Sequence, residues 1–184
     1  MLKLLRTNQR FLLGLFFLFV LRTSFADHYL VPSGSMEPTL LPGDRVLVDK
    51  RAYGLRIPLT EIKLIDGTAV ARGDIVVFDG PDSGTRLIKR VVALGGDLVE
   101  VRDGHVFIDG RLQPTATDPA NLQFGGGPDV APTLVPSGHV LVLGDARGNS
   151  RDGRWFGFVP VSSLYAQALR VYYRSERGPV WLPL

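Results

Sequence analysis

The sequence contains no cysteine among its 184 residues, which excludes thiol catalysis, thiolate metal sites and disulfide bridges. It also lacks a phosphate-binding glycine loop with its lysine, and a dinucleotide-binding glycine motif. The three histidines, His28, His105 and His139, do not have the spacing of metal ligands. We therefore expect neither a metal ion nor a cofactor, and no local context selects a histidine for a Ser-His-Asp triad.

Acidic residues are absent from the first 22 positions, which hold the basic residues Lys3, Arg6, Arg10 and Arg22. The formal net charge of the whole chain is +3, so the remainder without these four charges is close to −1. The basic character therefore belongs to the N-terminus, and nothing indicates a nucleic-acid partner.

Long apolar runs are also scarce, because only residues 11–21 form an uninterrupted run, of eleven residues. A helix of that length rises about 16 Å against a hydrocarbon core of roughly 30 Å, although Arg10 and Arg22 could snorkel and extend it. A cleavable signal peptide is the competing interpretation, since Ser24 and Ala26 place small residues at the −3 and −1 positions. A buried helix of the domain would need a polar face, which the run lacks.

Both membrane interpretations give the same orientation, with the basic end in the cytoplasm. We predict that residues 1–26 are this basic end plus a membrane anchor or signal-like segment. Residues 27–184 are then a β-rich domain on the extracytoplasmic side.

Glycine and proline are abundant, with 21 and 13 residues, which favours many short strands joined by turns. Apolar runs predict strands at residues 45–49, 75–78, 86–93, 98–102, 105–108, 138–143 and 169–173. Residues 50–71 are interpreted as a loop, and residues 113–136, with five prolines, show no period. The expected fold is mostly β, with antiparallel sheets or a partly open barrel, preceded by one N-terminal hydrophobic helix.

Paired carboxylates do not stand out as catalytic groups. Four aspartates each follow a glycine in a turn and are adequately explained as turn formers: Asp44, Asp74, Asp97 and Asp145. The remaining candidate is a serine nucleophile with a lysine base, a variant of triad chemistry. An unperturbed lysine has a pKa near 10.4, so only about one in 2,500 is neutral at pH 7, and the base must be desolvated.

Lys89 is the lysine best placed for desolvation, because strand alternation puts it on one apolar face with Leu87 and Val91. The ordinary interpretation is an edge-strand lysine whose amine reaches water. Arg90, on the other face, is interpreted as structural.

The candidate nucleophile lies in the stretch Pro32-Ser33-Gly34-Ser35-Met36-Glu37-Pro38-Thr39-Leu40, where prolines stiffen both ends. Alone, this stretch is a turn leading into a β-domain.

Together with three later segments, this stretch resembles the sequence boxes of type I signal peptidases, in the same order. The later segments are 72–78 (RGDIVVF), 88–91 (IKRV) and 144–154 (GDARGNSRDGR). The match extends from about Tyr29 to Pro160. The resemblance implies a membrane-anchored Ser/Lys endopeptidase that removes signal peptides from exported preproteins, and it favours a retained anchor.

The resemblance assigns roles residue by residue. Ser35 is similar to the nucleophile and Lys89 to the general base. Ser33, with the backbone N–H of Ser35, resembles the oxyanion hole. Ser150 resembles the hydroxyl that orients the lysine, while Asp152 and Arg154 resemble a supporting ion pair.

Eight apolar or aromatic positions match those lining the pockets for small substrate residues at −1 and −3: Tyr29, Val31, Met36, Leu40, Val46, Val77, Leu87 and Ile88. Ala146, Gly148 and Gly153 replace polar residues common in the last box. The segment between the lysine box and the last box is short, which implies a reduced insert subdomain around residues 98–136.

The implied location is the bacterial plasma membrane, with a single pass and a cytoplasmic N-terminus, and the implied partners are exported preproteins and membrane lipid. Two alternatives stay open: a specialised maturase of one exported pilin-like or conjugation protein, and an inactive membrane-tethered domain that binds preproteins.

Overall fold

A computed structural model describes residues 11, 14, 26–56, 63–65, 67–82, 84–114 and 127–184. The expected N-terminal hydrophobic helix therefore lies almost wholly outside the described residues, of which Phe11 and Gly14 are helical. Among the described residues, no helix combines the length and the apolar character that crossing a membrane requires.

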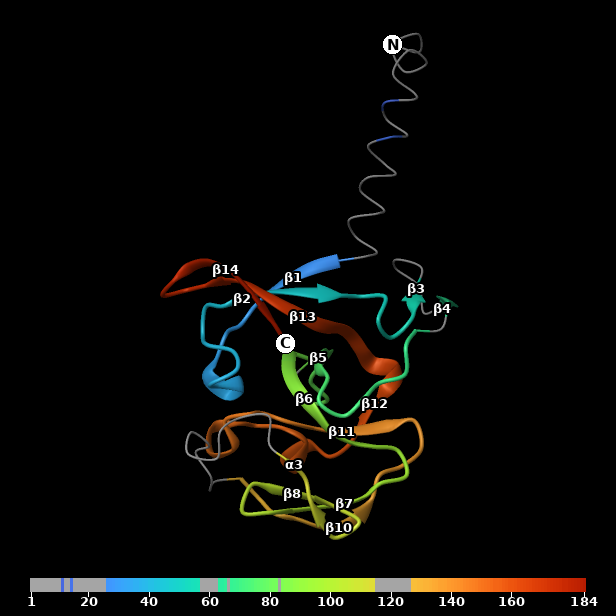
Figure 1. Ribbon diagram of the computed structural model, residues 1–184. Helices are drawn as coiled ribbons and strands as arrows, with labels where there is room; N and C mark the ends of the chain where they lie inside the picture. The colour runs from blue at the N-terminus through green and yellow to red at the C-terminus, as the bar shows by residue number, and fades with distance from the viewer. Residues whose placement is uncertain are drawn as a thin grey trace.

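The main structural element is an eight-stranded sheet in which all pairs are antiparallel (Figure 1). Its strands, in spatial order, are β1 (Ala26–Leu30), β2 (Arg45–Asp49), β13 (Leu164–Arg174), β5 (Ile75–Asp79), β6 (Arg86–Leu94), β11 (His139–Leu143) and β12 (Val159–Pro160), and β14 (Gly178–Pro183) also pairs with β13. The sheet ends at β1 and at β12 and does not close into a barrel.

A smaller antiparallel sheet lies at the end of the molecule opposite to β1 (Figure 1). Its strands, in spatial order, are β10 (Val130–Leu134), β7 (Leu98–Arg102), β8 (His105–Ile108) and β9 (Arg111–Leu112). These strands fall within the segment expected to form a reduced insert, and the division of the chain into domains stays a prediction.

Mostly β structure with antiparallel sheets is confirmed, and each of the seven expected strands has a counterpart. The interpretation of residues 50–71 as a loop was wrong in part, because β3 (Leu55–Arg56) and β4 (Lys63–Ile65) form a short hairpin there. The last expected strand begins five residues earlier, at Leu164, and a further strand, β14, follows it. Both differences arise because pairing with neighbouring strands, rather than apolar periodicity, defines these elements.

Among the described residues of 26–184, helical elements are short, and most of them surround the candidate site. They comprise η1 (Gly34–Met36), η3 (Arg147–Asn149), α3 (Gly153–Phe156) and η4 (Val161–Ser163). The first three elements carry residues of the nucleophile stretch and of the last sequence box.

Strand β6 lies between β5 and β11 and has core packing on both faces. Ile88 belongs to one buried cluster with Val77, whereas Val91 and Leu87 pack in a different cluster with Val76. Successive residues of β6 therefore face opposite sides, as its alternation predicts. A lysine inside such a strand is necessarily withdrawn from water.

Candidate active site

The segment that carries Ser35 is fixed by its own backbone. Residues 26–30 form β1, and the chain then turns through η1 before entering β2. Val31 N–H donates to the carbonyl oxygen of Asp44 at 2.9 Å, and Gly43 N–H donates to that of Val31 at 2.9 Å, so the two ends of the turn are tied together. Met36, the neighbour of Ser35, is fully buried and anchors η1 in the core.

The side chains of Ser35 and Lys89 meet although 54 positions separate them in sequence. The Nζ atom of Lys89 lies 2.5 Å from the Oγ atom of Ser35, within hydrogen-bond distance. Lys89 pairs across the sheet with the buried Val76 and is itself only 3% exposed. The edge-strand interpretation of this lysine is therefore wrong.

Burial lowers the pKa of Lys89 from 10.5 to about 8. The carboxylates of Asp152 and Asp145 oppose this shift, while the Arg154 guanidinium adds to it. At neutral pH a lysine with this pKa supplies a far larger neutral fraction than a solvated lysine does. The structure thus places a nucleophile candidate against an amine that can accept its proton.

Ser33 lies beside the reacting pair. Its Oγ donates to Ser35 Oγ at a long 3.4 Å, and its side chain is otherwise exposed. The Ser35 N–H belongs to the first turn of η1, where N–H groups have no acceptor within the helix. A hydroxyl and a backbone donor are therefore available on the same short turn.

Ser150 is close to Ser35 but makes no hydrogen bond among the described residues, although its Oγ is buried. A side chain at Gly144 would overlap both Ser150 Oγ and the Ser35 carbonyl oxygen, so all three groups are packed around one point. The expected hydrogen bond from the Lys89 amine to Ser150 Oγ is absent here, and the orienting role of Ser150 stays a prediction. A buried hydroxyl without a partner is unusual and indicates a group reserved for function.

Asp152 and Arg154 form a buried ion pair, with Arg154 Nε donating to Asp152 Oδ1 at 2.9 Å. Asp152 also caps α3 by accepting from the Arg154 N–H and accepts from the Gly144 N–H at 2.9 Å. Arg154 Nη2 donates to the carbonyl oxygen of Arg147 at 2.6 Å. The pair therefore fixes the loop that carries Ser150 at two points.

A second buried network was missed from the sequence. Asp145, interpreted there as a turn former, accepts two hydrogen bonds from Arg90 and one from Thr39 Oγ1 at 2.6 Å. Thr39 lies in the same stretch as Ser35, and Arg90 adjoins Lys89, so one carboxylate connects both segments to the last box. The feature of the sequence that could have indicated this network is an arginine, Arg90, directly after the candidate lysine.

Seven of the eight predicted pocket residues pack together. Tyr29 packs against the buried cluster that contains Val31, Met36, Leu40, Val46, Val77 and Ile88. Leu87 is the exception, because it faces the other cluster and lines a separate cavity of about 380 Å³ with Phe156. These seven residues form an apolar layer packed behind η1. That they line the substrate pockets stays a prediction.

Within the described ranges, no three His, Asp or Glu side chains lie close enough together to hold a metal ion. The two buried carboxylates nearest the site, Asp145 and Asp152, are bound by arginines. The chemistry available from the residues present is therefore that of serine and lysine.

The chain was compared with known proteins. The model of the family described as signal peptidase, peptidase S26, matches residues 4–173. The chain belongs to this family. A signal peptidase I of Pseudomonas fluorescens is 32% identical over 92% of this chain and 72% of that protein. A probable signal peptidase I-2 of Synechocystis sp. is 36% identical over 85% of this chain and 67% of that protein.

A solved structure of a signal peptidase I from Enterococcus faecalis is 32% identical, covering 54% of this chain and 97% of that one, with a TM-score of 0.47. As a member of the S26 family, the chain is a peptidase, a hydrolase of peptide bonds.

Replacing Arg154 by Met should destabilise this S26 peptidase strongly, because it leaves the fully buried Asp152 carboxylate without its counter-charge. Removing one partner of a buried pair costs about 3–5 kcal/mol, measurable as a lower free energy of unfolding in urea. Arg151→Met is the matched control, since the exposed Arg151–Asp82 pair should contribute about 0–1 kcal/mol. Equal losses in the two variants would contradict the supporting role of the buried pair.

Proposed function

We propose that this S26 peptidase cleaves signal peptides from exported preproteins, with Ser35 as nucleophile and Lys89 as general base. The observation that carries the proposal is the 2.5 Å contact between Lys89 Nζ and Ser35 Oγ inside the core. The names of the relatives, signal peptidase I, support the substrate class.

In the first step, neutral Lys89 accepts the Ser35 hydroxyl proton while Ser35 Oγ attacks the scissile carbonyl carbon. The Ser35 N–H and the Ser33 hydroxyl donate to the oxyanion that forms. One such donor contributes about 2.7–4 kcal/mol in other enzymes, which accounts for a second serine on the same turn. The resulting Lys89 ammonium then protonates the leaving amine, which departs as the N-terminus of the mature protein.

In the second step, neutral Lys89 takes a proton from water, and the hydroxide attacks the ester that joins Ser35 to the signal peptide. Collapse of this second oxyanion breaks the ester and returns the proton to Ser35 Oγ. The orienting role proposed for Ser150 belongs here, because its buried Oγ can accept a hydrogen bond from the amine without restoring a charge.

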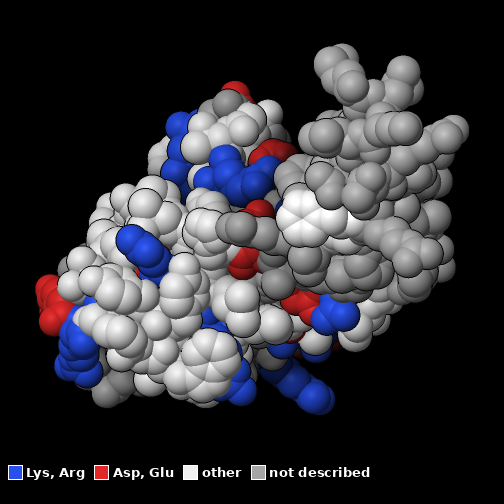
Figure 2. Space-filling view, turned by 90° about the horizontal axis from the view of Figure 1, so that it is seen from above, with Lys and Arg blue, Asp and Glu red and all other residues white. Residues whose placement is uncertain are grey.

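We further infer that the domain acts at a membrane surface, with residues 1–26 as the anchor and the site on the extracytoplasmic side. Leu30 on β1 and Trp181 and Leu182 on β14 are exposed apolar side chains, and β1 and β14 lie on the same upper side of the molecule in Figure 1. Seen from above, the described part of the surface has wide uncharged areas between separate basic and acidic groups (Figure 2). Such a surface suits contact with lipid.

Ser35→Ala and Lys89→Met should each abolish cleavage of a preprotein, lowering kcat by a factor on the order of 10⁶, as loss of a nucleophile or its base does in other serine peptidases. Mass spectrometry of a preprotein incubated with the purified protein measures the cleavage. Ser163→Ala and Lys50→Met are the controls and should retain wild-type rates. Normal cleavage by either dyad variant, or none by the wild type, would refute the proposed function.

The pH dependence provides an independent check. Because only the neutral form of Lys89 can accept the Ser35 proton, kcat/KM should rise with pH, with a limb near the pKa of about 8, and level off above it. Two pH units below this pKa, the rate should be about 100-fold lower than the plateau. A profile that is flat from pH 6 to pH 10 would contradict the role of Lys89.

A further inference from the structure

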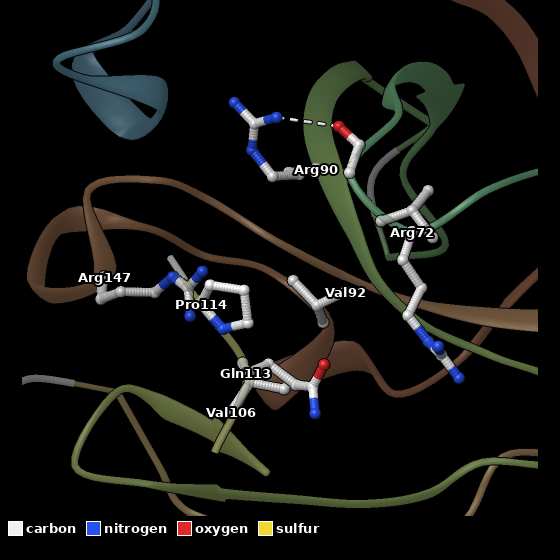
Figure 3. A pocket seen from close by; sticks show the side chains of 9 residues that line it. Arg72, Arg90, Val92, Val106, Gln113, Pro114 and Arg147 are labelled. Carbon is white, nitrogen blue, oxygen red and sulfur yellow. Dashed lines mark hydrogen bonds between the residues drawn. The ribbon is translucent and has the colours of Figure 1, made fainter. Parts of the chain in front are cut away.

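A second cavity, of about 270 Å³, lies between the main sheet and the small sheet, away from the Ser35 side of β6. Its wall contains three arginines, Arg72, Arg90 and Arg147, together with Val92 and Gln113 (Figure 3). Lys89 and Arg90 are successive residues of β6, so their side chains leave the strand on opposite faces. Among the described residues, none of Ser33, Ser35, Lys89 and Ser150 lines the cavity, which is therefore separate from the peptidase site.

Two of the three arginines are neutralised by carboxylates. Arg72 forms two hydrogen bonds with Asp97, and Arg90 forms two with Asp145. Arg90 also donates to the Gly73 carbonyl oxygen at 2.8 Å, which turns its guanidinium toward that loop (Figure 3).

Arg147 is different, because no carboxylate of the described residues lies within ion-pair distance of it. Its Nε donates to the Gly144 carbonyl oxygen at 2.8 Å, and its Nη1 donates to that of Gly104 at 2.9 Å. These neutral acceptors use only part of the five N–H groups of a guanidinium. In Figure 3 its side chain extends toward Pro114 and Val92, into the cavity.

A buried charge without a counter-charge is costly. Arg147 is 3% exposed, and this burial lowers the pKa of its guanidinium. The negative charges of Asp145 and Asp152, which are more distant, oppose this shift. Arg72 and Arg90 each have a carboxylate partner, so Arg147 is the one lining arginine without an ion pair among the described residues. An anion placed in the cavity beside Arg147 would provide the missing counter-charge.

We propose that this cavity binds a small oxyanion, a phosphate group, through the Arg147 guanidinium. A guanidinium presents paired N–H donors that match the geometry of phosphate oxygens. A water molecule occupies about 30 Å³ of liquid, so the cavity has room for a tetrahedral anion with accompanying water. The Gln113 side chain, half-buried on the same wall, is a second polar contact.

The site has a direct connection to the peptidase site. The Arg147 carbonyl oxygen accepts from Arg154, and Ala146 N–H, one residue earlier, donates to the Ser35 carbonyl oxygen at 3.2 Å. An anion that fixes Arg147 would therefore stabilise the loop that contacts the nucleophile.

The test is calorimetric titration of the full-length protein in nonionic detergent with inorganic phosphate, using sodium chloride of equal ionic strength as reference. We expect saturable binding of phosphate and not of chloride. A parallel titration with sn-glycerol 1-phosphate distinguishes the source, since tighter binding of this compound identifies a lipid headgroup and tighter binding of phosphate a free anion.

Two variants of lining residues test the assignment. Arg147→Gln removes the unpaired charge, and Gln113→Glu adds a carboxylate that occupies the anion's place, so each should weaken phosphate binding at least tenfold. Arg151→Gln, on the exposed side of the same loop, should bind as the wild type does. Absence of saturable binding, or wild-type affinity in both Arg147→Gln and Gln113→Glu, would overturn the proposal. Because binding is measured without a preprotein, its failure is separate from a failure of the proposed peptidase activity.

Discussion

The burial of the Lys89 amine against Ser35 is the interaction on which the rest of the structure depends. A lysine in the middle of a central strand opposes folding when it is charged, because the core cannot solvate an ammonium group. The main sheet nevertheless encloses it between β5 and β11 and leaves it 3% exposed. The same burial that opposes folding lowers the pKa of Lys89 toward neutrality, as the proposed role of a base requires.

The surrounding carboxylates fix the loops that meet at the amine. Asp145 holds Thr39 and Arg90, Asp152 holds Arg154 and the Gly144 N–H, and Asp44 accepts from Arg174 behind the nucleophile turn. Asp145 therefore connects the last sequence box to two distant segments, Asp152 connects two ends of that box, and Asp44 connects the start of β2 to β13. Their charges also act on Lys89, because Asp152 and Asp145 favour the ammonium form and Arg154 opposes it. The groups that fix these loops therefore also modulate the pKa of Lys89, although burial is the largest cause of its shift.

The sequence predicted many of the strands and the pairing of Ser35 with Lys89 more readily than the hydrogen bonds that hold this pair in place. Apolar runs located five strands of the main sheet, β2, β5, β6, β11 and β13, but not β1, β12 or β14, and the alternation around Lys89 placed it on a buried face. The short β3–β4 hairpin was not predicted because strands of two and three residues are too short to show an alternating apolar pattern. Asp145 was read as a turn former because its partners, Thr39 and Arg90, are 106 and 55 positions away. Local composition does not predict hydrogen bonds between residues so far apart in sequence. For the same reason the sequence did not predict that Arg147 is buried without an ion pair.

The most direct test of this account is the ionisation of Lys89 itself. Nuclear magnetic resonance of the protein with ¹³C-labelled lysine side chains gives the pKa of each amine, and loss of one signal in Lys89→Met assigns the resonance. The account predicts that Lys89 titrates with a pKa of about 8, while solvated lysines titrate near 10.4. A pKa of Lys89 near 10.4 would mean that the amine is charged at neutral pH, and would contradict its role as the base for Ser35.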